Sequence, residues 1–131
     1  MDDHPEDVAH RMGLHVIRRR LPGTMWGATD GHATIWIDDR LGQTEVRCTL
    51  AHELIHVHAR HATCQTPKVE RWVRRRTAEW LIPWEHLWEN RHSADLYDIA
   101  DRLDVTRHVL LDRLHHLTDH QKCKLTEGHA P

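Results

Sequence analysis

The pentapeptide His52-Glu53-Leu54-Ile55-His56 is the feature that most constrains this chain, because it follows the pattern HExxH. On an α-helix, two histidines four residues apart diverge by only about 40°, so both can reach one Zn²⁺ ion. Glu53 lies about 100° round the helix from His52 and is therefore better placed to hold a water than to bind metal. Zinc lowers the pKa of its bound water to about 7, and we expect Glu53 to take the proton as that water attacks a polarised carbonyl.

A chance pentapeptide on an amphipathic helix is the alternative, in a chain with 15 histidines. The surrounding sequence favours the metal site. Gly42 or Thr44 offers a helix start, and no proline or glycine interrupts residues 43–62. The motif therefore falls on a predicted helix, as its chemistry requires.

The length of 131 residues predicts one domain with a single apolar core. The acidic start and the lack of any apolar run near 15 residues predict neither a signal peptide nor a membrane span, and hence a cytoplasmic protein. Three cysteines, at positions 48, 64 and 123, do not suggest a disulfide framework.

The net charge of −2 gives no overall signature of nucleic-acid binding. Two arginine triplets, Arg18–Arg20 and Arg74–Arg76, are candidates for local contacts with anions. A solvated charged face is favoured for both, because neither triplet is interleaved with aromatic residues.

The order of the predicted elements indicates an α+β fold. A short helix ends at Gly13, and three strands follow at residues 14–20, 24–28 and 33–37. Turn signals at 21–23 and 30–31 predict that these strands form a three-stranded antiparallel sheet. The helix that carries HExxH comes next, and the later helices are expected at residues 69–82, 84–89, 95–103 and 106–117.

The predicted elements form a single domain over residues 1–117, with a C-terminal helical part over residues 93–117. Residues 118–131 are polar, and we expect them to be a disordered tail.

A catalytic zinc ion usually has three protein ligands, so the two histidines need a partner. Glu70 lies on the apolar face of the next predicted helix, within about 80° of Val73 and Thr77. A carboxylate on a buried face is costly unless it is paired or bound to metal, and Glu70 is therefore the expected third ligand. Glu79, on the opposite face, and other Asp, His and Cys residues remain alternatives, and two histidines with one carboxylate would also suit Fe(II).

The sequence from Arg47 to His56, with Glu70 and the later Leu81-Ile82-Pro83, resembles the ImmA/IrrE-type metallo-endopeptidases, especially short versions encoded by phages of actinobacteria. The resemblance covers about residues 14–117 and implies a small zincin-like domain. It implies His52, His56 and Glu70 as zinc ligands and Glu53 as the catalyst, with a regulator such as a phage or host repressor as the substrate. The chain departs from the family at Arg74–Arg76, where small or aromatic residues are usual, and this departure concerns substrate specificity.

Several other residues could take part in the chemistry. Cys48 shares the metal face and would close the site as a fourth ligand, but a buried thiol is favoured. His58 and His61 lie about 120° and 180° from His52, so surface positions are favoured for both. Tyr97, or a histidine of the C-terminal helices, could donate to an oxyanion, although a packed helix residue is favoured for Tyr97.

Four residues of the C-terminal region form a weak second metal cluster, for which a solvated tail is the favoured interpretation: His115, His116, His120 and Cys123.

The strand Thr34-Ile35-Trp36-Ile37 is a candidate for substrate binding. In zincin folds an edge strand beside the metal helix can hold an extended peptide antiparallel to itself. We therefore expect residues 34–37 to be such an edge.

The last two predicted helices have the apolar spacing of a helix-turn-helix, with Arg107, His108 and Arg113 facing outward. This is little positive charge for DNA binding, so core completion or protein docking is favoured. The main rival to a peptidase is nevertheless a non-catalytic regulator that binds DNA or protein through these helices, with zinc structural or absent. A zinc hydrolase that acts on a non-peptide amide is a further alternative.

Overall fold

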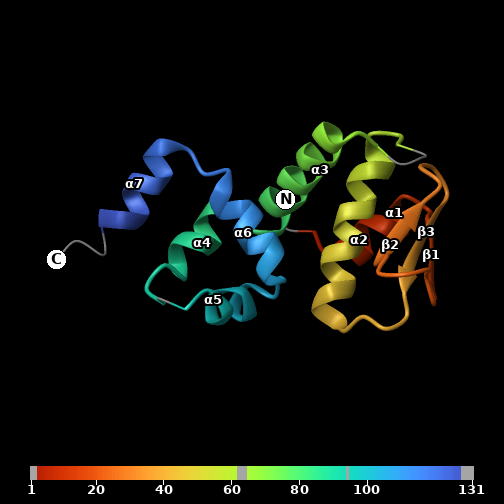
Figure 1. The fold of residues 1–131 in the computed structure, drawn as a ribbon, viewed down its shortest axis with the longest axis horizontal. Helices are drawn as coiled ribbons and strands as arrows, with labels where there is room; N and C mark the ends of the chain where they lie inside the picture. The colour runs from red at the N-terminus through yellow and green to blue at the C-terminus, as the bar shows by residue number, and fades with distance from the viewer. Residues whose placement is uncertain (1–2, 62–64, 94, 128–131) are drawn as a thin grey trace.

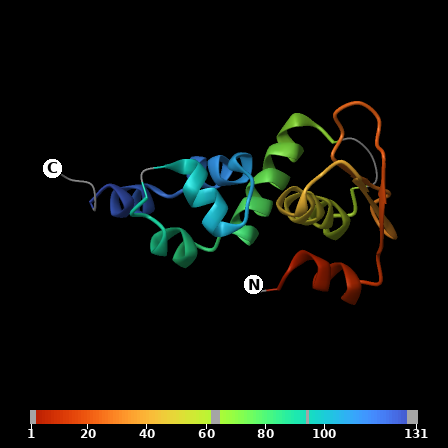
Figure 2. The ribbon, with the colours of Figure 1, turned by 90° about the horizontal axis from the view of Figure 1, so that it is seen from below.

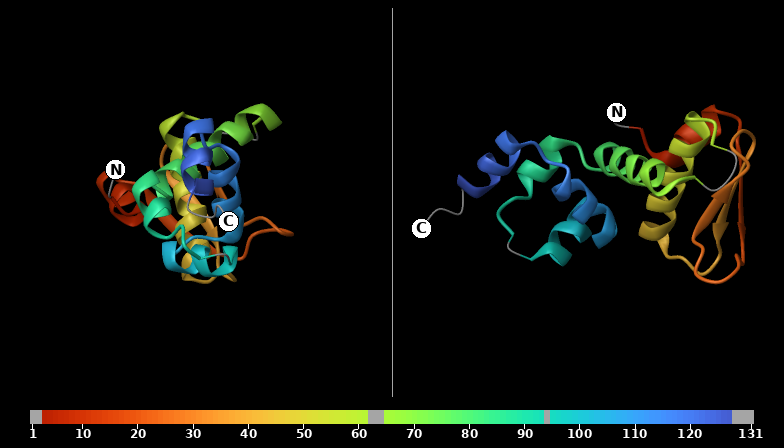
Figure 3. Two further views of the ribbon diagram at one scale, coloured as in Figure 1. Left: turned by 90° about the vertical axis from the view of Figure 1, so that its left-hand side faces the viewer. Right: turned by 45° about the horizontal axis from the view of Figure 1, so that its top comes forward.

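The computed structural model describes residues 3–61, 65–93 and 95–127 of the chain. Helix α1 (Pro5–Arg11) precedes the strands β1 (His15–Arg19), β2 (Gly27–Thr29) and β3 (Thr34–Asp38). The helices that follow are α2 (Gln43–His58), α3 (Pro67–Leu81), α4 (Trp84–Glu89), α5 (Leu96–Leu103), α6 (Arg107–His115) and α7 (Asp119–Glu127). The molecule is elongated, with the sheet at one end, α4–α7 at the other and α2 and α3 between them (Figures 1 and 3).

The fold is the predicted α+β class, but the sheet is mixed and not antiparallel. Its strand order is β1-β3-β2, with β1 parallel to β3 and β2 antiparallel to β3. The hairpin predicted at Asp30-Gly31 is confirmed, since it joins β2 to β3. The hairpin predicted across residues 21–23 is wrong, because β1 and β2 lie on opposite edges of the sheet.

Burial and one polar network explain this strand order. Ile35 and Ile37 of β3 are fully buried, whereas every residue of β1 is exposed, so the most apolar strand takes the centre. The turn that follows β1 is tied to the end of β3: the backbone N–H of Leu21 donates to Asp38 over 2.9 Å, and Arg40 donates to the carbonyl of Leu21 over 3.1 Å. These bonds hold residues 21–23 in the crossover, the connection that passes the end of β3 between β1 and β2.

Two apolar cores lie on either side of α2. The first joins the sheet, α1 and α2, and includes Ile35, Leu50 and Leu54. The second joins α2 to the C-terminal helices, and includes Cys48 and Ala51. Figure 2 shows α1 and α3 flanking α2. The helix that carries HExxH is therefore fixed by packing on more than one side.

The turn between α5 and α6 is bonded to the start of α2. Asp104 adopts a left-handed conformation with φ of 53°, accepts from the Thr44 hydroxyl over 2.6 Å, and its carbonyl accepts from Arg47 over 2.5 Å. Asp95 caps α5 and Thr106 caps α6, close to the predicted starts of these helices. These contacts place the N-terminal end of α6 over α2.

Arg113 of α6 is buried, although the sequence predicts that it faces outward. Its guanidinium is inserted between α6 and α3 and donates to the carbonyl of Ile82 over 2.7 Å. Arg107 bonds to the hydroxyl of Tyr97 and stacks on its ring. Both arginines of the presumed recognition helix thus contact other parts of the protein.

The prediction of a disordered tail is wrong for residues 119–127, which form α7. The hydroxyl and backbone N–H of Thr118 exchange hydrogen bonds with Gln121 and start this helix, and Leu125 packs against the second core. Residues 128–131 and Cys64 lie outside the described residues. In the part of the chain that is described, no helix has the length and apolar character to span a membrane.

Candidate metal centre

Helices α2 and α3 bring His52, His56 and Glu70 together. The Nε2 atom of His52 lies 3.4 Å from Oε2 of Glu70, and Nε2 of His56 lies 3.2 Å from Oε1. The two imidazole rings are one helical turn apart, with centroids separated by 5.0 Å. Glu70 lies in the first turn of α3, which Thr66 caps by accepting from the N–H of Val69.

These three side chains fit a tetrahedral cation. Their ligand atoms all lie within 4.8 Å of one another, and theirs is the sole such cluster of His, Cys, Asp and Glu in the described ranges. Metal–ligand bonds of about 2.0–2.1 Å at tetrahedral angles separate two ligand atoms by about 3.3 Å. The two nitrogen–oxygen separations, 3.2 and 3.4 Å, agree with that value, and the two imidazole nitrogens lie within 4.8 Å of each other.

The surroundings of both histidines favour the neutral form, which is the form that binds a metal. Burial lowers the pKa of His52, and the neighbouring His56 lowers it further. Burial also lowers the pKa of His56. Neutral imidazoles with a free nitrogen are the form that binds metal, and a carboxylate balances part of a cation's charge.

Glu53 stands beside the three candidate ligands without joining them. Its side chain is buried against β2, with 7 % of the residue exposed. Burial raises the pKa of Glu53 to about 7, and the negative charge of Glu70 acts in the same direction. Such a carboxyl group can gain and lose a proton near neutral pH, as a general base must.

His61 contacts the centre, which sequence analysis did not predict. After α2 ends, Arg60 adopts a left-handed conformation with φ of 61°, and this reverses the chain. The Nδ1 atom of His61 then lies 3.1 Å from Nδ1 of His56. The second ring nitrogen of a metal-binding histidine usually bonds to another group, which fixes the ring. His61 is that group for His56. The helical-wheel argument missed it because residue 61 is no longer helical.

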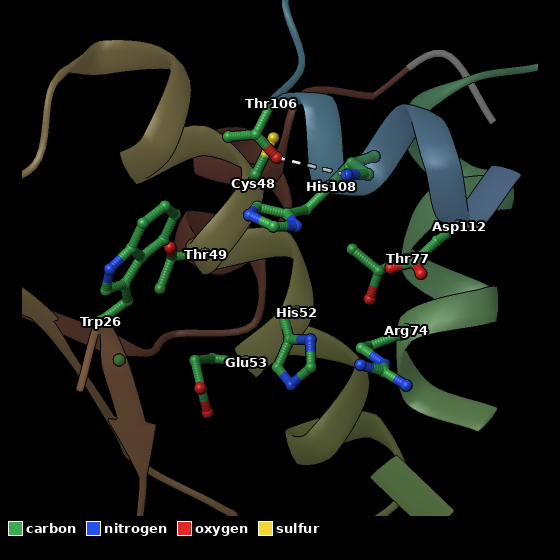
Figure 4. A pocket seen from close by; sticks show the side chains of 12 residues that line it. Trp26, Cys48, Thr49, His52, Glu53, Arg74, Thr77, Thr106, His108 and Asp112 are labelled. Atoms are coloured by element: carbon green, nitrogen blue, oxygen red, sulfur yellow. Dashed lines mark hydrogen bonds between the residues drawn. The ribbon is translucent and has the colours of Figure 1, made fainter. Parts of the chain in front are cut away.

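A cavity of about 300 Å³ opens beside the centre. Figure 4 shows His52 and Glu53 at its floor, Trp26 on the side of β2, Arg74 on α3, and His108 on α6. Gly27 of β2 also lines it, next to Glu53. The cavity thus has one candidate ligand, His52, together with Glu53 on one side and room for a polypeptide segment on the other.

Other candidate residues do not join the three converging side chains. Cys48 lines the cavity but is not part of that cluster; it is buried in the second core, where burial raises the pKa of its thiol. Glu79 lies near Arg75 and Arg76, at 3.7 and 4.0 Å. Tyr97 is 61 % exposed and does not line the cavity.

The remaining histidines and the last cysteine do not form a second centre. His58 is exposed on α2. The C-terminal cluster of His115, His116, His120 and Cys123 does not converge on a common point in the described residues.

The prediction that residues 34–37 form an edge strand is wrong. β3 is the central strand and is paired on both sides, so its backbone has no free groups for a peptide. The edge beside α2 is β2. Trp26 and Asp30 bond to β3, so by the alternation of an antiparallel ladder the N–H and C=O groups of Gly27 and Thr29 point to the free edge.

Comparison with known proteins agrees with this geometry. The profile of the IrrE N-terminal-like domain, a peptidase family numbered M78, matches residues 9–115. Neither the curated proteins nor the solved structures include a significant match to the chain. The match covers most of the sequence, including α2, α3 and α6, and we conclude that the chain belongs to the IrrE N-terminal-like family of metallopeptidases.

Proposed function

We propose that this protein is a zinc-dependent endopeptidase. The observation that carries the proposal is the convergence of His52, His56 and Glu70 on one point, with the Glu53 carboxyl beside it and an open cavity in front. A site closed by a fourth protein ligand would indicate structural zinc, but Cys48 is not part of the cluster.

Zinc bound by these three residues would supply a Lewis acid that polarises a carbonyl and makes a nearby water acidic at neutral pH. Glu53 accepts the proton from that water and later donates it to the leaving amine. Its burial against β2 holds the carboxyl in place, and His61 keeps the ring of His56 oriented.

The edge of β2 is the proposed surface for the substrate backbone. Gly27 lies at the cavity wall next to Glu53, and its N–H and C=O point to the free edge. An extended peptide paired with this edge would run past the metal centre, with its backbone positioned by hydrogen bonds. A substrate complex in which the peptide pairs with no residue of 26–29 would refute this assignment.

The proposed substrate is a regulatory protein such as a transcriptional repressor, cleaved in the cytoplasm of a bacterium or a phage-infected cell. Family resemblance supports this choice. The cavity is compatible with it, because it is small and open and suits one extended segment more than a folded domain.

The decisive experiment compares the zinc-loaded wild type with Glu53→Gln. We expect both proteins to retain about one zinc ion per chain, and hydrolysis of a repressor encoded nearby to fall at least about 100-fold in the variant, because the general base is lost. Metal content is measured by mass spectrometry and cleavage by gel and product sequencing.

Glu79→Gln serves as the matched control, since Glu79 is on α3 but pairs with arginines away from the centre. It should leave zinc content and cleavage unchanged. Full activity of Glu53→Gln would remove Glu53 as the base, and a zinc-loaded wild type that cleaves neither the repressor nor a broad peptide library would refute the peptidase function.

A further inference from the structure

The three consecutive arginines of α3 have different surroundings. Arg75 and Arg76 lie beside the carboxylate of Glu79, at 3.7 and 4.0 Å. Arg74 instead lines the cavity that contains His52 and Glu53, and Figure 4 shows its side chain beside His52. Within the described residues, Arg74 has no hydrogen bond and no ion pair. One guanidinium of the triplet is therefore free at the site.

The acidic groups nearest to Arg74 do not neutralise it. Glu70 is one turn earlier on α3, but its carboxylate is directed at His52 and His56, over 3.4 and 3.2 Å. Asp112 enters the same cavity from α6 and makes no ion pair with Arg74 in the described structure.

We propose that Arg74 is a specificity-determining residue that binds an acidic side chain of the substrate, one or two residues from the scissile bond. The proposal rests on the proposed peptidase function. A guanidinium binds a carboxylate through two parallel hydrogen bonds, which no neutral side chain reproduces. Since an extended chain advances about 3.3 Å per residue, a peptide held over the centre brings neighbouring side chains within reach of α3.

The same guanidinium could act differently, by stabilising the oxyanion that forms during hydrolysis. The two roles have separate consequences. Loss of an oxyanion donor lowers kcat/KM for every peptide by the same factor, whereas loss of a specificity residue lowers it only for peptides with the acidic residue.

The test is cleavage-site profiling of a proteome-derived peptide library with the zinc-loaded wild type, Arg74→Gln and Arg75→Gln. Arg75 is the matched control, because it is on the same helix but outside the cavity. We expect Asp or Glu to be enriched at one position beside the cut for the wild type and for Arg75→Gln, and this enrichment to disappear for Arg74→Gln.

Fluorescence-quenched peptides that differ only by Glu or Gln at that position then give the size of the acidic preference. The wild type should prefer Glu about threefold to tenfold in kcat/KM, the range for a charged hydrogen bond at a partly exposed site. The ratio should fall to about one in Arg74→Gln, and Arg74→Glu should prefer Lys. The proposal would be overturned if Arg74→Gln lost kcat/KM equally for both peptides, or if this variant still preferred the acidic peptide.

Binding separates this inference from the peptidase function. Fluorescence anisotropy compares labelled peptide mixtures with a fixed central Glu or Gln, using Glu53→Gln alone and combined with Arg74→Gln. Tighter binding of the Glu mixture, lost in the double variant, supports the anion site even if no peptide is cleaved. Equal binding of both mixtures refutes it even if the wild type proves to be a peptidase.

Discussion

Gly27 is a residue at which the sheet closely approaches the side chain of Glu53. A Cβ atom at this position would lie 2.5 Å from Cγ2 of Thr49 and 3.2 Å from Cγ and Oε1 of Glu53. Real side chains do not tolerate the first distance, so α2 could not pack at its present distance from β2 with any other residue here. The absence of one methyl group therefore sets the position of Glu53.

Gly27→Ala should lower the free energy of unfolding by about 1–3 kcal/mol and reduce hydrolysis, because overpacking pushes α2 and Glu53 away from the sheet. Urea unfolding and peptide cleavage measure the two effects. Thr49→Ser removes the methyl group nearest to the new Cβ, so it should restore much of the lost stability when combined with Gly27→Ala. Strictly additive effects of the two substitutions would contradict the predicted clash.

Asp38 is the residue that ties the crossover to the sheet. It is buried and accepts from Arg40 over 2.8 and 3.0 Å and from the N–H of Leu21. The guanidinium of Arg40, followed by the backbone N–H of Leu21, holds the pKa of Asp38 well below its usual range. Its ionised form therefore stabilises the fold above the unfolded pKa of about 3.9, and this contribution is lost as the pH falls toward the folded pKa.

Asp38→Asn should accordingly be less stable than the wild type at pH 7, and the difference should shrink between about pH 4 and pH 2. Urea unfolding over that pH range gives the difference directly. Asp39→Asn is the control, since Asp39 forms only an exposed ion pair with Arg20. A difference for Asp38→Asn that stays constant down to pH 2 would exclude the proposed linkage.

At the scale of elements, the candidate metal centre joins α2 to α3, and Arg113 joins α6 to α3. The centre takes two side chains from α2 and one from α3. Arg113 of α6 joins the end of α3 through the carbonyl of Ile82, and so fixes the helix that carries His108 and Asp112 into the cavity. The cavity wall is thus made by β2 at one end of the molecule, by α6 at the other end, and by α2 and α3 between them (Figure 1).

Zinc should stabilise the protein by cross-linking α2 and α3. Free zinc at 100 times the Kd should add about 2.7 kcal/mol to the free energy of unfolding, and EDTA should remove it. The increase, measured by calorimetry as a rise in Tm, should be much smaller in Glu70→Gln and unchanged in Glu79→Gln. An equal rise in Glu70→Gln would show that Glu70 is not a ligand.

At the scale of the whole molecule, two cores share the helix α2, which makes separate folding of either end unfavourable. The predicted division into a domain over residues 1–117 and a tail can be tested by truncation. α7 has no buried residue among those described, and Leu125 alone of its residues packs against the second core. By contrast, α5 and α6 contribute the buried Ile99, Ala100 and Leu110.

Removal of residues 118–131 should therefore cost less than about 1 kcal/mol and leave the zinc-dependent rise in Tm intact. Removal of residues 93–131 should abolish cooperative unfolding, because it exposes the second core. Circular dichroism during thermal unfolding distinguishes these outcomes for the two truncated proteins. A sharp transition in the shorter fragment would refute the single-domain prediction.

The sequence predicted most of the helices because their signals are local. Asp95 starts α5 and Thr106 starts α6, each by a bond to a residue two or three positions away. Helix α3 begins at Pro67, two residues before its predicted start. The grouping of His52, Glu53 and His56 also follows from the helical repeat, and the apolar face of α3 was enough to choose Glu70 over Glu79.

The strand order, the edge strand beside α2, and the surroundings of Arg74 and Arg113 depended on tertiary contacts. The hydrogen bond between Leu21 and Asp38 joins residues 17 positions apart, and the bond between Arg113 and Ile82 joins residues 31 positions apart. Hydrophobic periodicity predicts which face of a segment is buried, but not which other segment will cover it. The sequence therefore determined which side chains could hold a metal, and only the packing of distant segments decided which cavity they face.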